Sequence, residues 1–236
     1  MKLYQFILCT LLAVGLGFAF APTAFAMPLA QRVIVVDAGH GGWDPGMVSG
    51  KVDEKDINLQ IAHKLQHLLE LGGATVIMTR DDDADLSKTK SGDMSVRRHI
   101  ANASHADIFV SIHQNAFGSA GVHGAQVFYF NESDNSKKLA EAIQAQIKSF
   151  ANPANRFNAR ANSNYFVLKQ TEMPAVLVEC GFLTNPSEKA RLQTDDYQEK
   201  MAWSIYLGIV DYFRAQAYTG EGETPNGETP EATMRP

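Results

Sequence analysis

The alternation of uninterrupted apolar runs with helical stripes restricts the fold of this chain more than any other feature of its sequence. The runs 33–36 (Val-Ile-Val-Val) and 175–178 (Ala-Val-Leu-Val) contain no polar residue, which is typical of strands that are buried on both faces. Between them, Ile57, Ile61 and Leu65 recur at helical spacing. Strands of this kind separated by amphipathic helices predict an α/β fold with three layers, a mainly parallel sheet of about six strands with helices on both faces.

Periodicity and turn residues give the expected element boundaries. A helix is expected to begin near Glu54, with Asp53 as its N-cap, and to end at Gly72-Gly73. The expected strands are 32–37, 76–80, 107–113, 126–130, 165–168 and 175–179, and the other expected helices are 96–103, 136–150 and 196–215.

The two ends of the chain differ in composition from its middle. Residues 1–26 carry a single charge, Lys2, followed by a long apolar run and by Ala24-Phe25-Ala26, which is typical of a cleaved secretory signal. An uncleaved membrane anchor is the alternative, because the apolar run is nearly long enough to span a bilayer. Both interpretations place the protein outside the cytoplasm. Residues 32–213 are expected to form one domain, and residues 219–236, rich in Gly, Glu, Thr and Pro, are expected to be a disordered tail.

Charge and cysteine content exclude two classes of protein. The formal net charge is −5, so the chain has no general basic field that would hold nucleic acid. Of its two cysteines, Cys9 lies in the export segment, which leaves Cys180 alone in the mature chain. A single thiol forms no internal disulfide, so this is not a disulfide scaffold.

Ionisable residues follow three of the predicted strands. His40 comes directly after the first strand, His113 ends the third and Glu179 ends the sixth, while Glu54 opens the helix after a glycine-rich loop. The carboxyl ends of parallel strands meet at one edge of a sheet, where the working groups of such folds collect. Two imidazoles and a carboxylate are a common open zinc site, and a second carboxylate such as Glu179 can take a proton from a metal-bound water.

Other candidate residues have simpler explanations. His63 and His67 are four residues apart but point away from the apolar stripe of their helix and lack the glutamate of a zinc-peptidase motif, so we expect them on the surface. His123 could line a pocket but is not expected to bind metal. Cys180 could be a nucleophile, yet it neighbours Glu179 on a strand, where adjacent side chains point to opposite faces. A buried thiol acting as a small apolar group is the expected role.

Four motifs are recognisable along the chain. They are Asp37-Ala38-Gly39-His40-Gly41-Gly42 with Asp44-Pro45-Gly46, Glu54-Lys55 with Asn58-Leu59, residues 106–113 with Asn115, and residues 174–183 with Asn185. Together these motifs resemble one known family, the zinc-dependent N-acetylmuramoyl-L-alanine amidases with an autolysin-type catalytic domain. They stand in the family's order and cover about residues 32–213.

The resemblance implies the residues and chemistry of the site. It implies zinc bound by His40, Glu54 and His113, with Glu179 as the catalytic carboxylate, and hydrolysis of the amide between N-acetylmuramic acid and L-alanine in peptidoglycan. Asn115 and Arg98 recur in the family's pattern, and either contact substrate or brace loops; Asn115 is kept as a substrate-binding candidate.

The resemblance also gives expectations about biological role. The compact form is most similar to the germination-specific amidases that act on spore cortex, together with a polysaccharide deacetylase, and a monomer is expected. Only residues 116–123 separate the second histidine motif from the next expected strand. This link is too short for the helix that plugs the zinc site in some relatives. The alternatives are a vegetative cell-wall autolysin of the same chemistry, a peptidoglycan-binding protein without catalysis, and a thiol-dependent hydrolase.

Overall fold

A six-stranded sheet forms the centre of the computed structural model, which describes residues 27–220. The expected export segment lies outside the described residues. So does the tail expected over residues 219–236, except residues 219 and 220, which end the last helix. The strands of the sheet follow the order β4-β1-β5-β8-β6-β7. They are β1 (Val33–Ala38), β4 (Thr75–Met78), β5 (Ile108–Asn115), β6 (Gln126–Tyr129), β7 (Arg160–Ala161) and β8 (Ala175–Phe182).

The sheet is parallel except at one junction. β1 pairs in parallel with β4 and β5, and β5 pairs in parallel with β8, whereas β6 is antiparallel to β8. In the register of β5 and β8, His113 lies opposite Glu179. The mainly parallel sheet predicted from the apolar runs is therefore confirmed, and its register places two of the predicted site residues side by side.

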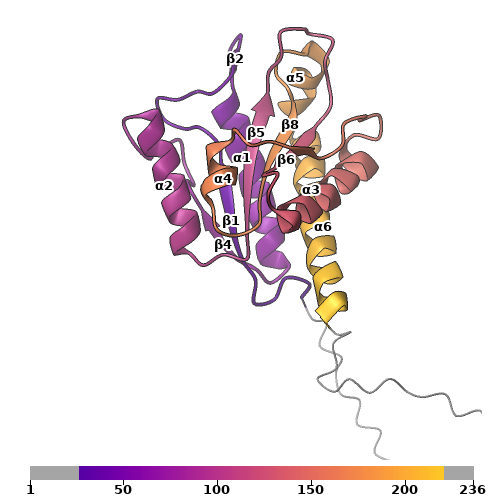
Figure 1. Cartoon of the computed structure of the whole chain (residues 1–236). Coiled ribbons are helices and arrows are strands. Elements are labelled where there is room, and N and C mark those ends of the chain that lie inside the picture. The colour runs from indigo at the N-terminus through magenta and orange to yellow at the C-terminus, as the bar shows by residue number, and fades with distance from the viewer. Residues whose placement is uncertain (1–26, 221–236) are drawn as a thin grey trace, which may run out of the picture.

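Helices cover both faces of the sheet, as Figure 1 shows. One face packs against α1 (Glu54–Leu71), α3 (Asp134–Gln146) and α6 (Asp195–Gly220), and the other against α2 (Lys90–Ala103) and α4 (Phe166–Gln170). Alternate strand residues enter the two cores: Val36 and Val178 face the first group of helices, while Val35 and Leu177 face the second. This alternation places Cys180 in the core with α1 and leaves Glu179 on the face of α2 and α4.

Several expected boundaries were wrong. Residues 165–168 form the start of the helix α4 and not a strand, and the short strand β7 lies just before them. A short apolar run does not distinguish a buried helical turn from a strand, and this one packs Val167 and Leu168 into the second core. β5 and β8 also continue past His113 and Glu179, because pairing resumes after an irregularity between His113 and Asn115.

The observed helix starts also differ from the expected ones. Asp53 sits at the N-cap of α1 without a side-chain capping bond, because the amides of Glu54 and Lys55 donate to the carbonyls of Met47 and Pro45 instead. The helix expected at 96–103 begins at Lys90, where the Thr89 side chain caps it. The remaining elements are the π-helical turn η1 (Ile147–Ala151), the helix α5 (Pro186–Leu192), and a small hairpin of β2 (Val48–Ser49) and β3 (Val52–Asp53). No helix among residues 27–220 is long and apolar enough to cross a membrane.

Candidate active site

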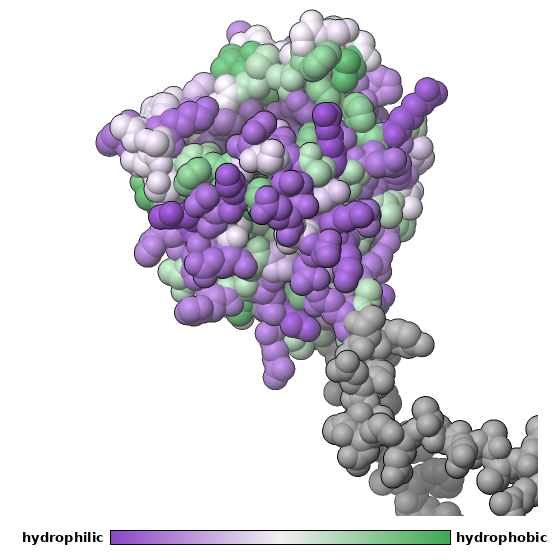
Figure 2. All heavy atoms as spheres, in the orientation of Figure 1, coloured by the Kyte–Doolittle hydropathy of each residue, from purple (hydrophilic) through white to green (hydrophobic). Residues whose placement is uncertain are grey.

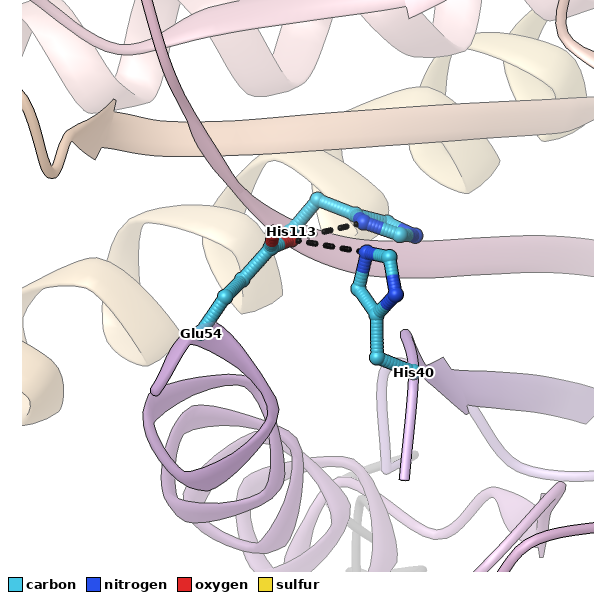
Figure 3. Close-up of side chains that lie close together, drawn as sticks. All are labelled: His40, Glu54 and His113. Atoms are coloured by element: carbon cyan, nitrogen blue, oxygen red, sulfur yellow. Dashed lines mark hydrogen bonds and ion pairs between the residues drawn. The ribbon is translucent and has the colours of Figure 1, made fainter. Parts of the chain in front are cut away.

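The three predicted metal ligands converge where the parallel strands end. The donor atoms of His40, Glu54 and His113 lie within 4.8 Å of one another, and no other group of this kind occurs among the described residues. Glu54 Oε1 is 2.9 Å from His113 Nδ1 and 3.3 Å from His40 Nε2. Figure 3 shows the carboxylate reaching from the first turn of α1 towards both rings. The sequence therefore identified side chains that the fold brings together from the β1–α1 loop, from α1 and from β5.

The loop after β1 brings His40 to this position through an unusual backbone. His40 has φ of 62°, a left-handed conformation that costs a non-glycine residue of order 1–3 kcal/mol. Its neighbour Gly39 is required by space, since a Cβ there would lie 2.3 Å from the His113 ring. Gly46, with φ of +67°, would likewise place a Cβ 2.6 Å from Glu54 Oε2. The glycines of this motif thus leave the space that His40, Glu54 and His113 need in order to come together.

The carboxylate of Glu54 is fixed from several directions. The backbone amides of Met47 and Gln114 donate to its two oxygens at 2.8 and 3.1 Å. Burial raises the pKa of Glu54, but hydrogen bonds and charges from His113 and His40 outweigh it and hold that pKa well below its ordinary value. Glu54 is therefore an ionised carboxylate between two imidazoles, which is the electrostatic setting that a divalent cation requires.

His40 is oriented by a second carboxylate. Its Nδ1 lies 2.8 Å from Asp44 Oδ2, so that its Nε2 faces Glu54. Burial lowers the pKa of His40, whereas the hydrogen bonds and charges of Glu54 and Asp44 raise it, with a net shift upward. A carboxylate behind a histidine is a common arrangement that fixes the tautomer of a metal-binding imidazole. Asp44 belongs to the glycine-loop motif, but sequence reasoning gave it no role.

Glu179 lines the same cavity as the three converging residues. This cavity of about 310 Å³ also contains Asn115 and Tyr165. Burial, opposed by the charge of His113, raises the pKa of Glu179 to about 7. The Tyr165 hydroxyl donates to Glu179 Oε1 at 3.4 Å, whereas the buried Oε2 has no hydrogen-bond partner among the described residues.

Two buried arginines hold the loop that carries His40. The guanidinium of Arg97, with 0% of its side chain exposed, pairs with Asp37 and Asp93 at 2.6 Å each and donates to the His40 carbonyl at 2.7 Å. Arg80 donates to the carbonyl of Gly39 at 3.0 Å. Neither arginine was predicted from the sequence, and Arg98, which recurs in the family's pattern, is only half-buried.

The other candidates lie away from this cluster. His63, His67 and His123 are exposed, so the expectation that the first two lie on the surface is confirmed. Cys180 is buried, and burial together with the charge of Glu179 raises the pKa of its thiol above the ordinary value. This environment disfavours a thiolate nucleophile.

Asn115 and the segment after it border the cavity. The Asn115 side chain accepts a bond from the amide of Ala116 at 2.8 Å, while its backbone carbonyl accepts from Leu183. It therefore braces its own loop and still faces the cavity. The link from β5 to β6 contains no helix, in agreement with the short spacing seen in the sequence.

Comparison with known proteins agrees with this geometry. Residues 34–211 match the family model described as N-acetylmuramoyl-L-alanine amidase. The chain is 38% identical to the germination-specific N-acetylmuramoyl-L-alanine amidase of Bacillus subtilis over 85% of its own length and 86% of that protein. It is 34% identical to the B. subtilis amidase LytC, covering 36% of that longer protein.

A solved structure shares the fold. The CwlD amidase from Clostridioides difficile, determined in complex with the GerS lipoprotein, superposes with a TM-score of 0.76 at 40% sequence identity, over 78% of this chain and 100% of that one. The family match spans most of the described residues and includes every residue of the cluster. The chain therefore belongs to the N-acetylmuramoyl-L-alanine amidase family.

Proposed function

We propose that this amidase is zinc-dependent, with zinc held by His40, Glu54 and His113. The donor set fits zinc, since two imidazoles and one carboxylate leave a coordination position open, and the three donor atoms lie within 4.8 Å of one another. Zinc, when bound, would polarise the scissile carbonyl and lower the pKa of a water molecule.

Glu179 is the proposed catalytic carboxylate, and the observation that carries this proposal is that it lines the cavity with one oxygen, Oε2, buried and without a hydrogen-bond partner among the described residues. A buried carboxylate oxygen without a donor is costly, and a reacting water would supply that donor. With a pKa of about 7, Glu179 can accept a proton from the attacking water and return it to the leaving amine of L-alanine at neutral pH. Tyr165 orients the carboxyl through Oε1. Asn115, which lines the cavity, is proposed to contact the substrate.

The proposed substrate is peptidoglycan of the spore cortex, which the protein would meet outside the cytoplasm. Its support is the similarity to the germination-specific B. subtilis enzyme and to CwlD. A vegetative autolysin of the same chemistry is the alternative, because LytC is also similar. A binding protein without catalysis is disfavoured by the complete set of Glu179 and the three convergent donors.

The comparisons also bear on partners. The resemblance suggested a deacetylase acting in sequence, but the comparisons provide no support for one. The C. difficile relative was instead solved with a lipoprotein, so a protein partner of that kind is the better proposal for this chain.

Digestion of purified walls tests the proposed function. The enzyme should contain about one zinc per chain, lose activity to a chelator, and release peptides whose free amino terminus is L-alanine. Glu179→Ala should keep zinc and abolish cleavage, whereas the exposed Glu172→Ala should behave as wild type. Release of muropeptides with the lactyl amide intact, or full activity of Glu179→Ala, contradicts the mechanism. Faster release from cortex than from vegetative wall is expected, and the reverse preference would favour the autolysin.

A further inference from the structure

A second hollow lies beside the cavity that contains Glu179. It is a groove of about 550 Å³ between β6, β7 and the end of β8, and it shares Asn115, Asn164 and Tyr165 with the cavity that contains Glu179. Figure 2 shows hydrophobic side chains gathered at the upper end of this view of the molecule, near the loops that Figure 1 places after β5 and around α5. A substrate whose amide is cleaved beside Glu179 therefore meets an adjoining surface. One of its two arms, the glycan or the stem peptide on either side of that amide, can lie along this surface.

The groove has a single charge. Its walls consist of aromatic residues such as Phe157 and Phe182 and of amides such as Gln126 and Asn162, and Arg160 is the only ionisable group besides the Tyr165 hydroxyl at its rim. The Arg160 side chain is exposed, and no described residue forms an ion pair or hydrogen bond with it. An unpaired arginine, in a groove without acids and in a chain of net charge −5, is suited to bind an anion with its planar fork of donors.

The position of Arg160 adds a second kind of recognition. β7, which consists of Arg160 and Ala161, is the last strand of the sheet and pairs on one side only, with β6. An edge strand can pair with the backbone of an extended peptide, while side chains along it select the peptide's substituents. A glycan chain offers no such backbone.

The two arms of the substrate differ in charge. The lactyl carboxyl of muramic acid is consumed in the amide that the enzyme cleaves, so the acetylated glycan arm is neutral. The stem peptide carries free carboxylates beyond L-alanine. We propose, on the basis of the function proposed above, that the groove is the subsite for the stem peptide, held extended along β7, and that Arg160 pairs with a carboxylate of a residue beyond L-alanine.

Substrates that differ only in charge test this proposal. The metal-loaded mature enzyme is given three synthetic compounds: muramoyl-L-Ala-D-Glu with free carboxylates, the same compound with both carboxyls amidated, and muramoyl-L-alanine amide. Arg160→Gln should lower kcat/KM for the charged compound by about tenfold or more, the effect expected for a hydrogen bond to a charged group, and should leave the two neutral compounds within about twofold. The matched control is Arg214→Gln, which changes an exposed arginine on α6.

The possible outcomes distinguish a failure of the proposed peptide subsite from a failure of the proposed amidase function. If the wild type cleaves these compounds and Arg160→Gln loses no more than Arg214→Gln on the charged one, the peptide subsite is refuted while the amidase chemistry stands. An equal loss on all three compounds also refutes it, because the arginine would then act without a carboxylate. If the wild type cleaves none of them, the proposed function fails. Titration with the dipeptide L-Ala-D-Glu then still tests the groove, since the affinity of Arg160→Gln should fall about tenfold and equal affinities would overturn the inference.

Discussion

Replacing Arg97 is expected to damage the fold and the proposed metal site together. Its guanidinium makes four bonds at once, to the carboxylates of Asp37 and Asp93 at 2.6 Å and to the carbonyls of Ala38 and His40 at 2.8 and 2.7 Å. Arg97→Met keeps the aliphatic stem but removes every donor, which leaves Asp37 as a buried carboxylate without its cation.

The expected magnitudes follow from this geometry. Removing one partner of a buried ion pair costs about 3–5 kcal/mol, so Arg97→Met should lose about that much unfolding free energy at neutral pH. Arg97→Lys keeps the charge but cannot span the four acceptors with one ammonium group, and should lose about 1–3 kcal/mol. In Arg97→Lys the loop that holds the strained His40 loses a support, so zinc affinity should fall about 10- to 100-fold.

Urea denaturation of the metal-free protein and chelator competition for zinc measure the two effects. Arg98→Met is the matched control, since Arg98 is the next residue on α2 but half-buried, and it should change stability by less than about 0.5 kcal/mol. An Arg97→Met protein as stable as this control refutes the buried-pair argument. An Arg97→Lys protein that is destabilised but binds zinc with wild-type affinity shows that Arg97 supports the fold alone.

The pH dependence of stability gives an independent check. Burial raises the pKa of Asp37, but the charge of Arg97 and hydrogen bonds from Ser111 and Thr79 bring it below the ordinary value of 3.8. A lowered pKa contributes stability above the unfolded pKa, and this contribution is lost as the pH falls through the folded value. The difference between wild type and Arg97→Met should therefore be largest near neutral pH and should narrow below about pH 4.

Two further predictions concern Glu179, the proposed catalytic carboxylate, and its neighbour Cys180. With the pKa of Glu179 at about 7, kcat/KM should rise as the pH increases through about 7; because the hydrogen bond from Tyr165 lowers that pKa, Tyr165→Phe should move the midpoint upward, and a midpoint that stays or falls contradicts this role. Cys180→Ala should keep kcat/KM within about twofold and lose on the order of 1 kcal/mol of stability, as measured by muropeptide release and urea denaturation; loss of activity in a folded variant would restore the thiol hypothesis.

The sheet and the positions of the proposed ligands could be predicted because each depends on local pattern. A strand that is covered on both faces has a run without polar residues, and parallel strands bring their carboxyl ends to one edge. His113 and Glu179 lie opposite each other on neighbouring strands, so their positions at the ends of apolar runs were sufficient to predict that they lie close together. The strand predicted over residues 165–168 was wrong, because four apolar residues fit a helical turn as well as a strand. The helix α5 had an unused signal in Asn185, whose side chain accepts from the amide of Glu188, a pattern typical of a helix start.

The supporting residues were harder to predict, because charged side chains are usually assigned to the surface. Asp93, Arg97 and Ala101 are buried on α2 and are spaced by four residues, whereas Arg98 lies about 100° away around the helix. An acid, a base and an alanine on one helical stripe, beside an aspartate in the first strand, indicate a buried ion pair, and this pattern was present in the sequence. What the sequence did not contain was the identity of the acceptors, because the carbonyls of Ala38 and His40 lie at the end of β1 and in the loop after it, where His40 has a left-handed conformation. Arg97 therefore donates to the same strained backbone that carries His40, which is why its replacement tests the fold and the position of His40 together.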